Sequence, residues 1–312
     1  MNGTIYMPVG EVCSSISDTY REKKNMVTLI NTSDVLEGRV LNHERVPNSN
    51  LKGQFKKTFQ RDDILYSEIR PQNRRFAYVD FSPIDYIAST KLMVIRAKKD
   101  VVSPKYLYYF LKNSSTVAEL QLLAETRSGT FPQITFSEVA NLTIPVPSLA
   151  VQEVIVQTMQ CLEDKITCNE QINDNLQQQA FSVFDNLIAN AENNDYTVSD
   201  YAFLNPKRTL AKNQVARSID MSQLSTSGAF PSGWEMKPFN GGMRFTNGDT
   251  LLARITPCLE NGKTAFIDFL DDGEVAFGST EYIVLAPKND TPPEMLYCLA
   301  RYPASVSYTH LT

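Results

Sequence analysis

Apolar and polar residues are arranged over the first half of the chain in a way that predicts short β-strands. Three runs rich in apolar, β-branched and aromatic residues are typical of strands, at residues 64–69, 76–81 and 92–95. Residues 70–75 separate the first two runs and carry proline and asparagine, so they are predicted to form a loop. These runs indicate a domain that contains β-sheet.

Apolar residues with the spacing of a helix follow the predicted strands. Pro104 suits the first turn of a helix, and apolar residues at 106, 107, 110 and 111 form one stripe behind it. Residues 143–147 have the sequence Thr-Ile-Pro-Val-Pro, which can continue neither a helix nor a central strand. We therefore expect residues 5–147 to form one α+β domain.

The longest regular segment comes next, at residues 148–188. Ser148 is a good N-cap, and neither glycine nor proline interrupts the run, so a single helix about 60 Å long is predicted. Apolar or small residues recur along it with the four-three spacing of a coiled-coil seam. A lone helix of this length cannot bury such a stripe, so we expect a partner helix. The seam positions are Ile155, Met159, Leu162, Ile166, Asn169, Asn173, Leu176, Ala180, Val183 and Leu187.

Two asparagines interrupt the apolar seam at its middle. Asn169 and Asn173 are of the kind that fixes the register and orientation of a helix pair, at some loss of stability. The alternative is that the helix breaks or bends at these residues.

The chain then repeats itself. Residues 59–65 resemble residues 245–251, and residues 104–108 resemble residues 293–297, in the same order along the chain. The period of about 190 residues is far longer than the ~20–50 residues of a solenoid unit, so each copy is expected to be a domain. The spacer helix is expected at residues 148–190 and the second domain at residues 191–312.

The second copy has no counterpart of the long helix. It matches the first copy only as far as the short helix that follows Pro293. We therefore expect the chain to be a fragment, truncated at its C-terminus.

Composition places the chain among soluble proteins with free thiols. The chain has 312 residues, of which 42% are hydrophobic, and it can hold two domains. No run approaches ~18 uninterrupted apolar residues, so no membrane span is expected, and the N-terminus lacks a signal-peptide layout. The five cysteines are an odd number without close pairs, which favours reduced thiols in the cytoplasm.

Charge is distributed unevenly along the chain. The net charge is −5, yet residues 52–112 contain thirteen Lys and Arg against six acids. Residues 153–185 contain one Lys against six acids, and residues 237–301 contain six Lys and Arg against nine acids. A local cationic surface suits a phosphate backbone, although a solvated charged face is the alternative.

Motifs of catalysis are weak. Residues 262–264 copy the end of a P-loop, but Pro257 stands where the leading glycine should be. Asp220 with Glu235 and Lys237 has the loose spacing of a metal-dependent nuclease, a pattern that arises by accident in most chains of this size. Cys161 and Cys168 lie on one helix face and are expected to be core-facing thiols rather than metal ligands.

A specific arrangement closes the first copy. Residues 129–134 have the sequence Gly-Thr-Phe-Pro-Gln-Ile, residues 142–149 have the sequence Leu-Thr-Ile-Pro-Val-Pro-Ser-Leu, and Gln152 and the long helix follow. This arrangement resembles the target-recognition module of specificity (S) subunits of type I restriction-modification systems, which ends in an Ile-Pro-x-Pro strand exit, a glutamine and a spacer helix. The resemblance covers almost the whole chain, and that family is itself a tandem repeat.

The resemblance implies a DNA-binding scaffold without catalysis, metal or cofactor of its own. Each of two recognition domains is expected to read one half of a split target, while antiparallel spacer helices set the distance between the halves. The implied partners are double-stranded DNA, adenine-methylating modification subunits and ATP-driven restriction (translocase) subunits. S-adenosylmethionine, ATP and Mg are expected on those subunits, and no membrane is involved.

Residue chemistry, and not matched motif positions, selects the candidate DNA contacts. Arginine suits guanine, and asparagine or glutamine suits adenine, while any of these residues is alternatively a solvated surface group. The candidates in the first copy are Lys56, Lys57, Arg70, Gln72, Asn73, Arg74, Arg75, Lys91 and Arg127. Those in the second copy are Arg254, Asn261 and Lys263.

Two other functions fit the same sequence. A stand-alone DNA-binding nuclease would need carboxylates clustered at one strand edge. A coiled-coil interaction protein would use the long helix as an arm and would bind duplex DNA without a dependence on salt.

Overall fold

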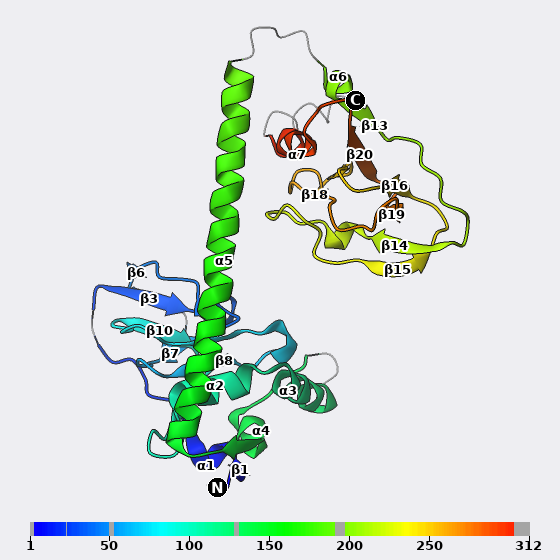
Figure 1. The fold of residues 1–312 in the computed structure, drawn as a ribbon. Coiled ribbons are helices and arrows are strands. Elements are labelled where there is room, and N and C mark those ends of the chain that lie inside the picture. The colour runs from blue at the N-terminus through cyan, green and yellow to red at the C-terminus, as the bar shows by residue number, and fades with distance from the viewer. Residues whose placement is uncertain (1–2, 23, 50–52, 128–130, 191–196, 303–312) are drawn as a thin grey trace. The chain divides into compact units, whose positions relative to one another are not determined.

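The computed structural model describes residues 3–22, 24–49, 53–127, 131–190 and 197–302 (Figure 1). The chain divides into two compact units, Met1–Lys165 (unit 1) and Ile166–Thr312 (unit 2), and the boundary falls inside helix α5 (Leu149–Ala189). Each unit has its own sheets and its own apolar core. The three-part division expected from the sequence, with the helix as a separate segment, stays a prediction.

Unit 1 contains two four-stranded sheets. Their strands are β2 (Cys13–Ile16), β3 (Met26–Ile30), β6 (Val46–Pro47), β7 (Phe55–Lys57), β8 (Ile64–Ser67), β9 (Phe76–Tyr78), β10 (Tyr86–Ser89) and β11 (Leu92–Ala97). One sheet has the order β2-β11-β8-β9 and is antiparallel throughout. The other has the order β6-β3-β10-β7 and includes the parallel pair β3–β10. The strands expected at 64–69, 76–81 and 92–95 are confirmed as β8, β9 and β11.

Strand β8 ends two residues earlier than the sequence pattern suggested. The hydroxyl of Ser67 accepts a hydrogen bond from the Ile69 backbone N–H at 3.0 Å. Such a local side-chain bond turns the backbone out of the ladder. The loop to β9 therefore begins at Glu68.

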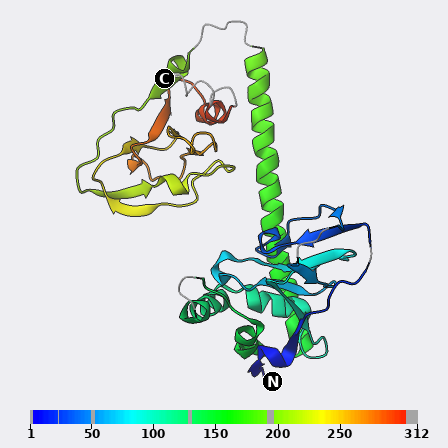
Figure 2. The ribbon, with the colours of Figure 1, turned by 180° about the vertical axis from the view of Figure 1, so that it is seen from behind.

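Helices cover the first sheet of unit 1. They are α1 (Val9–Val12), α2 (Pro104–Lys112), α3 (Ser114–Arg127) and α4 (Phe136–Asn141). Strand β12 (Thr143–Val146) forms a two-stranded sheet with β1 (Ile5–Pro8), and β4 (Val35–Leu36) pairs with β5 (Arg39–Val40). Both views show β1, α4 and the start of α5 at the same end of unit 1 (Figures 1 and 2). The proline-rich segment is thus the short strand β12, and helix α5 begins two residues after Pro147.

Unit 2 repeats this topology. Its elements are α6 (Val198–Tyr201), β13 (Ala202–Leu204), β14 (Val215–Ile219), β15 (Glu235–Pro238), β16 (Met243–Phe245), β17 (Thr250–Ala253), β18 (Thr264–Phe266), β19 (Ala276–Gly278), β20 (Tyr282–Pro287) and α7 (Pro293–Arg301). The sheet orders are β13-β20-β17-β18 and β15-β14-β19-β16, and the parallel pair is β14–β19. Each order matches that of unit 1 strand for strand, which confirms the predicted repeat.

A buried aspartate begins the equivalent central strand in each unit. Asp63 precedes β8 and accepts hydrogen bonds from Arg96 Nε and Nη2, both at 2.7 Å. Asp249 precedes β17 and contacts Arg208 at 2.7 Å. Both carboxylates are 1% exposed. Arg96 belongs to β11, whereas Arg208 comes from the segment before β14, so the repeat keeps the carboxylate but not the source of the guanidinium.

Helix α5 is helical from Leu149 to Ala189 without interruption, so the alternative of a break at Asn169 or Asn173 is not found (Figure 1). In unit 1 the buried Gln152 side chain bonds the backbone of Ser103, Val101 and Pro147 at 2.8–3.1 Å. In unit 2, Phe181 stacks on Tyr297 of α7, with ring centroids 6.3 Å apart.

We expect Asp249→Ala to destabilise unit 2 by about 3–5 kcal/mol, because it leaves the Arg208 guanidinium without its buried partner. The single tryptophan, Trp234, lies in unit 2, so urea unfolding followed by tryptophan fluorescence reports this unit. Asp63→Ala, the matched change in unit 1, should leave the Trp234 transition in place. A loss below about 1 kcal/mol for Asp249→Ala would contradict the structural role of the pair.

Candidate nucleic-acid interface

Two connections leave the sheets of unit 1 at the same end. Residues 68–75 join β8 to β9, and the turn at residues 89–91, which starts with the last residue of β10, leads to β11. Leu92 pairs with Ser67, and the Glu68 N–H donates to the Lys91 carbonyl at 3.0 Å, so the two connections lie side by side. With residues 56–57 of β7, this end carries six Lys and Arg against the single carboxylate of Glu68. We call it the loop end of unit 1.

The loop at residues 68–75 is held in an unusual backbone conformation. Arg70 (φ 44°) and Arg74 (φ 52°) are both left-handed and flank the 3-10 turn Pro71–Asn73. The Gln72 N–H donates to Gln121 Oε1 of α3 at 3.2 Å, and the Arg70 N–H donates to the Pro132 carbonyl at 3.1 Å. Left-handed conformations of non-glycine residues persist only where the surroundings fix them. The loop is therefore pre-organised by α3 and by the segment after it.

Three side chains of this loop are available for contact. Arg70, Gln72 and Asn73 are exposed, and their side chains make no hydrogen bond or ion pair within the described parts of the chain. They provide a guanidinium fork and two amides, the groups that recognise base edges.

The remaining two arginines of the loop are partly engaged. Arg74 Nη2 donates to Ser114 Oγ at 2.9 Å, and Arg75 Nη1 donates to the Ser33 carbonyl at 2.9 Å. Both side chains are half-buried. They tie the loop to α3 and to the segment before β4, and each keeps some donors toward solvent.

Adjacent lysines of β7 have different environments. Lys56 is exposed, whereas the half-buried Lys57 Nζ donates to the carbonyls of Thr90 and Leu92 at 3.0 and 2.8 Å. Burial lowers the pKa of Lys57 below its usual range. Lys57 therefore joins β7 to the turn at residues 89–91 from inside the fold.

Lys91 remains half exposed at the loop end. Its Nζ lies 3.5 Å from Glu68 Oε2 and donates to Gln133 Oε1 at 3.2 Å. Arg127 is the last residue of α3, and its side chain lies outside the described residues.

The equivalent loop end of unit 2 uses its cations differently. Arg254 Nη2 pairs with Glu281 Oε2 at 2.9 Å, and Lys263 Nζ donates to the Met221 carbonyl at 2.8 Å. Asn261 is exposed, and its side-chain amide has no partner among the residues that the structure describes.

The ion pair beside the loop is reversed in sign between the units. Glu68 and Lys91 of unit 1 occupy the places of Arg254 and Glu281 of unit 2, because the Arg254 N–H also donates to the Glu281 carbonyl at 2.9 Å. Ser89 and Ser279 each accept the backbone N–H two residues later, at 3.3 and 3.1 Å. This pair was not predicted from the sequence, although the alignment of the two copies places residues of opposite charge at these positions.

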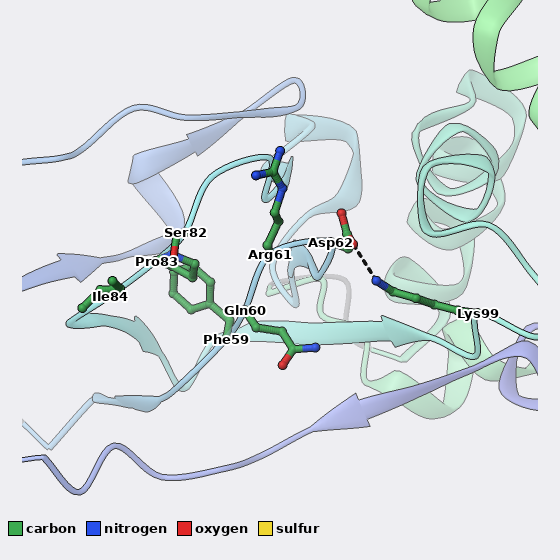
Figure 3. Close-up of a pocket in the computed structure, with 8 residues that line it drawn as sticks. All are labelled: Phe59, Gln60, Arg61, Asp62, Ser82, Pro83, Ile84 and Lys99. Carbon is green, nitrogen blue, oxygen red and sulfur yellow. Dashed lines mark hydrogen bonds and ion pairs between the residues drawn. The ribbon is translucent and has the colours of Figure 1, made fainter.

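A cavity lies at the opposite end of the sheets of unit 1 (Figure 3). Asp62 bonds Lys99 Nζ at 2.6 Å and Tyr78 Oη at 2.8 Å, while Arg61 is exposed. Figure 3 shows the Arg61 side chain directed away from the Asp62–Lys99 pair. These residues were not among the candidates from the sequence, and they include one acid, Asp62, against two cations, Arg61 and Lys99.

The nuclease-like residues come together but form a surface ion pair. Lys237 Nζ lies 2.7 Å from Asp220 Oδ2 and 2.9 Å from Glu235 Oε2, and both acidic side chains are more than half exposed. Within the described ranges, no group of three or more His, Cys, Asp or Glu is placed to hold a metal ion. The ammonium fills the space between the two carboxylates.

The seam of α5 forms a second exposed surface. Its seven large apolar side chains are between 37% and 63% exposed, and Asn169, Asn173 and Ala180 are exposed too. Cys161 and Cys168 are exposed, so the expectation of core-facing thiols is wrong. The helix face that packs on unit 1 instead carries Gln152 and Val156. No helix in the described part of the chain is long and apolar enough to cross a membrane.

These features match a known family. The family model for the "Type I restriction modification DNA specificity domain" matches residues 6–178, more than half of the chain, so the chain belongs to this family. It is 43% identical over 158 residues to the type I restriction enzyme HindI specificity subunit of Haemophilus influenzae. It is 34% identical over 99 residues to the type I restriction enzyme EcoAI specificity subunit of Escherichia coli. The matches span 51% and 30% of this chain, and only 34% and 17% of those subunits.

Solved structures share the fold. A chain from a structure described as "Structural basis underlying complex assembly and conformational transition of the type I R-M system" has a TM-score of 0.53 at 16% identity, covering 99% of this chain and 82% of that one. The type I restriction-modification system S subunit from M. genitalium has a TM-score of 0.50 at 15% identity, covering 99% and 80%. The α+β fold with two β-rich domains separated by a long helix is therefore that of specificity subunits.

We expect Lys57→Ala to lower the free energy of unfolding by about 1–3 kcal/mol, because two backbone carbonyls lose their shared donor. The neighbouring Lys56→Ala should stay within about 0.5 kcal/mol of the unchanged protein, since its side chain is exposed. Urea unfolding followed by far-UV circular dichroism measures both. If the two substitutions changed the free energy of unfolding equally, the structural role of Lys57 would be contradicted.

Proposed function

We propose that this chain is the DNA sequence-recognition subunit of a type I restriction-modification complex. Residues 5–147 and 191–312 are the two target-recognition domains, each of which binds one half of a bipartite target, and residues 148–190 are the spacer. The observation that supports this most is the loop end of unit 1, where cations and free amides surround a pre-organised loop. Family membership and the repeated topology support the same function.

The loop end of unit 1 combines two kinds of contact. Lys56 and Lys91 offer exposed or half-exposed ammonium groups that suit phosphates, which supply affinity without sequence information. Arg70, Gln72 and Asn73 offer side chains that suit base edges in the major groove. Lys57 and Lys263 act inside the fold and position the neighbouring turns.

The contribution of unit 2 to phosphate binding is smaller. Residues 237–301 carry more acids than bases, and its two loop cations are engaged with Glu281 and a backbone carbonyl. We therefore expect unit 2 to contribute more to base recognition than to electrostatic attraction for the DNA backbone.

The chemistry of the complex belongs to partner subunits. Modification subunits methylate adenine with S-adenosylmethionine, and restriction subunits cleave with ATP and Mg, while this chain selects the site. The exposed seam of α5 is covered in the complex by helices of the assembly. Five unpaired cysteines favour a reducing cytoplasm as the place of action.

Duplex DNA binding by the full chain should weaken with salt, and removal of one phosphate contact should reduce that dependence. We expect Lys56→Ala and Lys91→Ala each to lower the slope of log affinity against log salt by about 0.9, because each removes one cation assigned to a phosphate. Fluorescence anisotropy with labelled duplexes at several salt concentrations measures the slope.

The control is Arg61→Ala, which removes an exposed arginine at the opposite end of the sheets. Its slope should equal that of the unchanged chain. If Arg61→Ala reduced the slope as much as Lys56→Ala, the assignment of the loop end would be wrong, and binding that is independent of salt would reject the proposed function.

The seam should govern assembly and not the stability of the chain itself. Ile166→Asp places a charge at an exposed seam position, so unfolding should change by less than about 0.5 kcal/mol. Co-purification with the modification subunits should fall at least tenfold, because the charge is buried without a partner in the assembly.

Gln171→Asp is the matched control, since Gln171 is exposed on α5 outside the seam. It should co-purify like the unchanged chain. Equal recovery of the modification subunits with Ile166→Asp would show that the seam is not an assembly surface.

A further inference from the structure

The equivalent loops of the two units expose different chemical groups. Residues 68–75 of unit 1 correspond to residues 254–263 of unit 2, because both connect the paired central strands β8–β9 and β17–β18. Both contain an isoleucine and a proline two residues apart, at 69 and 71 and at 255 and 257. The position between them is Arg70 in unit 1 and Thr256 in unit 2.

The loop of unit 1 presents a free arginine. Arg70 is exposed, and no partner of its guanidinium lies in the described part of the chain. In unit 2, by contrast, Arg254 is paired with Glu281 and Lys263 with a backbone carbonyl. Among the described residues, residues 254–263 therefore present no cation without a partner.

Besides the exposed Glu260 beside Asn261 and the paired Arg254, the loop of unit 2 presents methyl groups and an amide. Ile255 is 41% exposed, and the next residue, Thr256, and Asn261, six residues after Ile255, are exposed too. Their backbone is ordered: the Leu259 N–H donates to the Ile255 carbonyl, and the Asn261 N–H donates to the Pro257 carbonyl, both at 2.9 Å.

The end of this loop is fixed as well. Arg301 Nη1 of α7 donates to the Gly262 carbonyl at 2.9 Å, and Leu259 is buried. Asn261 is thus carried on a turn that α7 holds in place, and little ordering is needed before it contacts a base.

These groups match different base pairs. In the major groove, arginine bonds the O6 and N7 of guanine, asparagine bonds the N6 and N7 of adenine, and apolar groups contact the methyl of thymine. Arg254 is exposed but shares its guanidinium with Glu281, so it would have to give up this ion pair before it could adopt the first of these roles, whereas Arg70 has no such competitor among the described residues.

We propose that the loop at residues 254–263 reads an A·T pair, with the Asn261 amide on adenine and the methyl groups of Ile255 and Thr256 on thymine. The loop at residues 68–75 reads a G·C pair through Arg70. This inference rests on the proposed function and specifies the base chemistry of each half-site.

Selection of duplexes from a randomised library by the full chain tests the inference. The unchanged chain should enrich a guanine position in one half of the target and an A·T pair in the other. Asn261→Asp should lower the preference for adenine at that pair by about 5- to 150-fold, because a carboxylate accepts from cytosine and cannot donate to adenine N7. The base preferences at positions in the other half of the target should not change.

Asn289→Asp is the matched control. Asn289 is an exposed asparagine of unit 2 that follows β20 at the opposite end of the same sheet, so the substitution adds the same charge away from the loop. The sequences that it enriches should equal those enriched by the unchanged chain.

Arg70→Lys should lower the preference for guanine in the other half of the target by a similar factor. The substitution keeps the charge, but lysine lacks the bidentate fork.

Base analogues in the selected duplex provide a second readout that needs no protein variant. Replacing the thymine of the A·T pair by uracil should weaken binding about threefold to fourfold, the value of one lost methyl contact. The same replacement elsewhere in the duplex should have no such effect.

The outcomes separate the inference from the proposed function. One contrary outcome is that the unchanged chain and the Asn261→Asp variant enrich the same sequences, and another is that the variant loses a preference for G·C instead of A·T. In either case the inference is wrong while DNA recognition stands. If the chain enriches no sequence at all, the proposed function fails and the inference with it.

Discussion

The antiparallel register of β8 with β9 and β11 is the constraint on which the candidate interface depends. Because Ser67 lies opposite Leu92 and Tyr66 opposite Phe76, residues 68–75 and 89–91 leave the sheet at one end. A slip of one residue would turn every side chain of β8 to the other face, and the two faces pack into different apolar clusters, Ile64 and Tyr66 in one and Leu65 in the other. The register therefore decides which loops are neighbours before any loop side chain is placed.

The two units share this register, but the acidic and basic residues of the ion pair beside the loop have changed places between them. The buried aspartate before the central strand persists in both units, since it caps the turn by accepting a backbone N–H at 2.7–2.8 Å. The arginine that neutralises it comes from different segments, and the ion pair beside each loop is reversed in sign. An ion pair stabilises the loop equally in either orientation, so its sign is free to follow what each loop binds.

Much of the fold was predictable from the sequence because it depends on local patterns. The strands β8, β9 and β11, the start of α2 at Pro104, the full length of α5 and the repeat all followed from spacing, capping and proline positions. A loop at residues 70–75 was also predicted. Its 3-10 turn and the left-handed conformation of its two arginines were not. Left-handed arginine has no sequence signature, because contacts with α3 impose it.

The roles of individual cations could not be predicted. Lys56 and Lys57 are adjacent and identical in type, yet only Lys57 reaches the carbonyls of Thr90 and Leu92. Arg254 gains its partner from a residue 27 positions later in the chain. Such contacts arise only after the sheets have formed, and the exposure of Cys161 and Cys168 similarly depends on which face of α5 packs on unit 1.

Site-directed photo-cross-linking to duplex DNA shows whether the loop end of unit 1 contacts the duplex. A photoreactive phenylalanine derivative replaces the exposed Gln72 at the loop end of unit 1, or the exposed Ile84 at the opposite end of its sheets. We expect cross-links to DNA from position 72 and few or none from position 84. Cross-links from position 84 alone would contradict the assignment of the loop end.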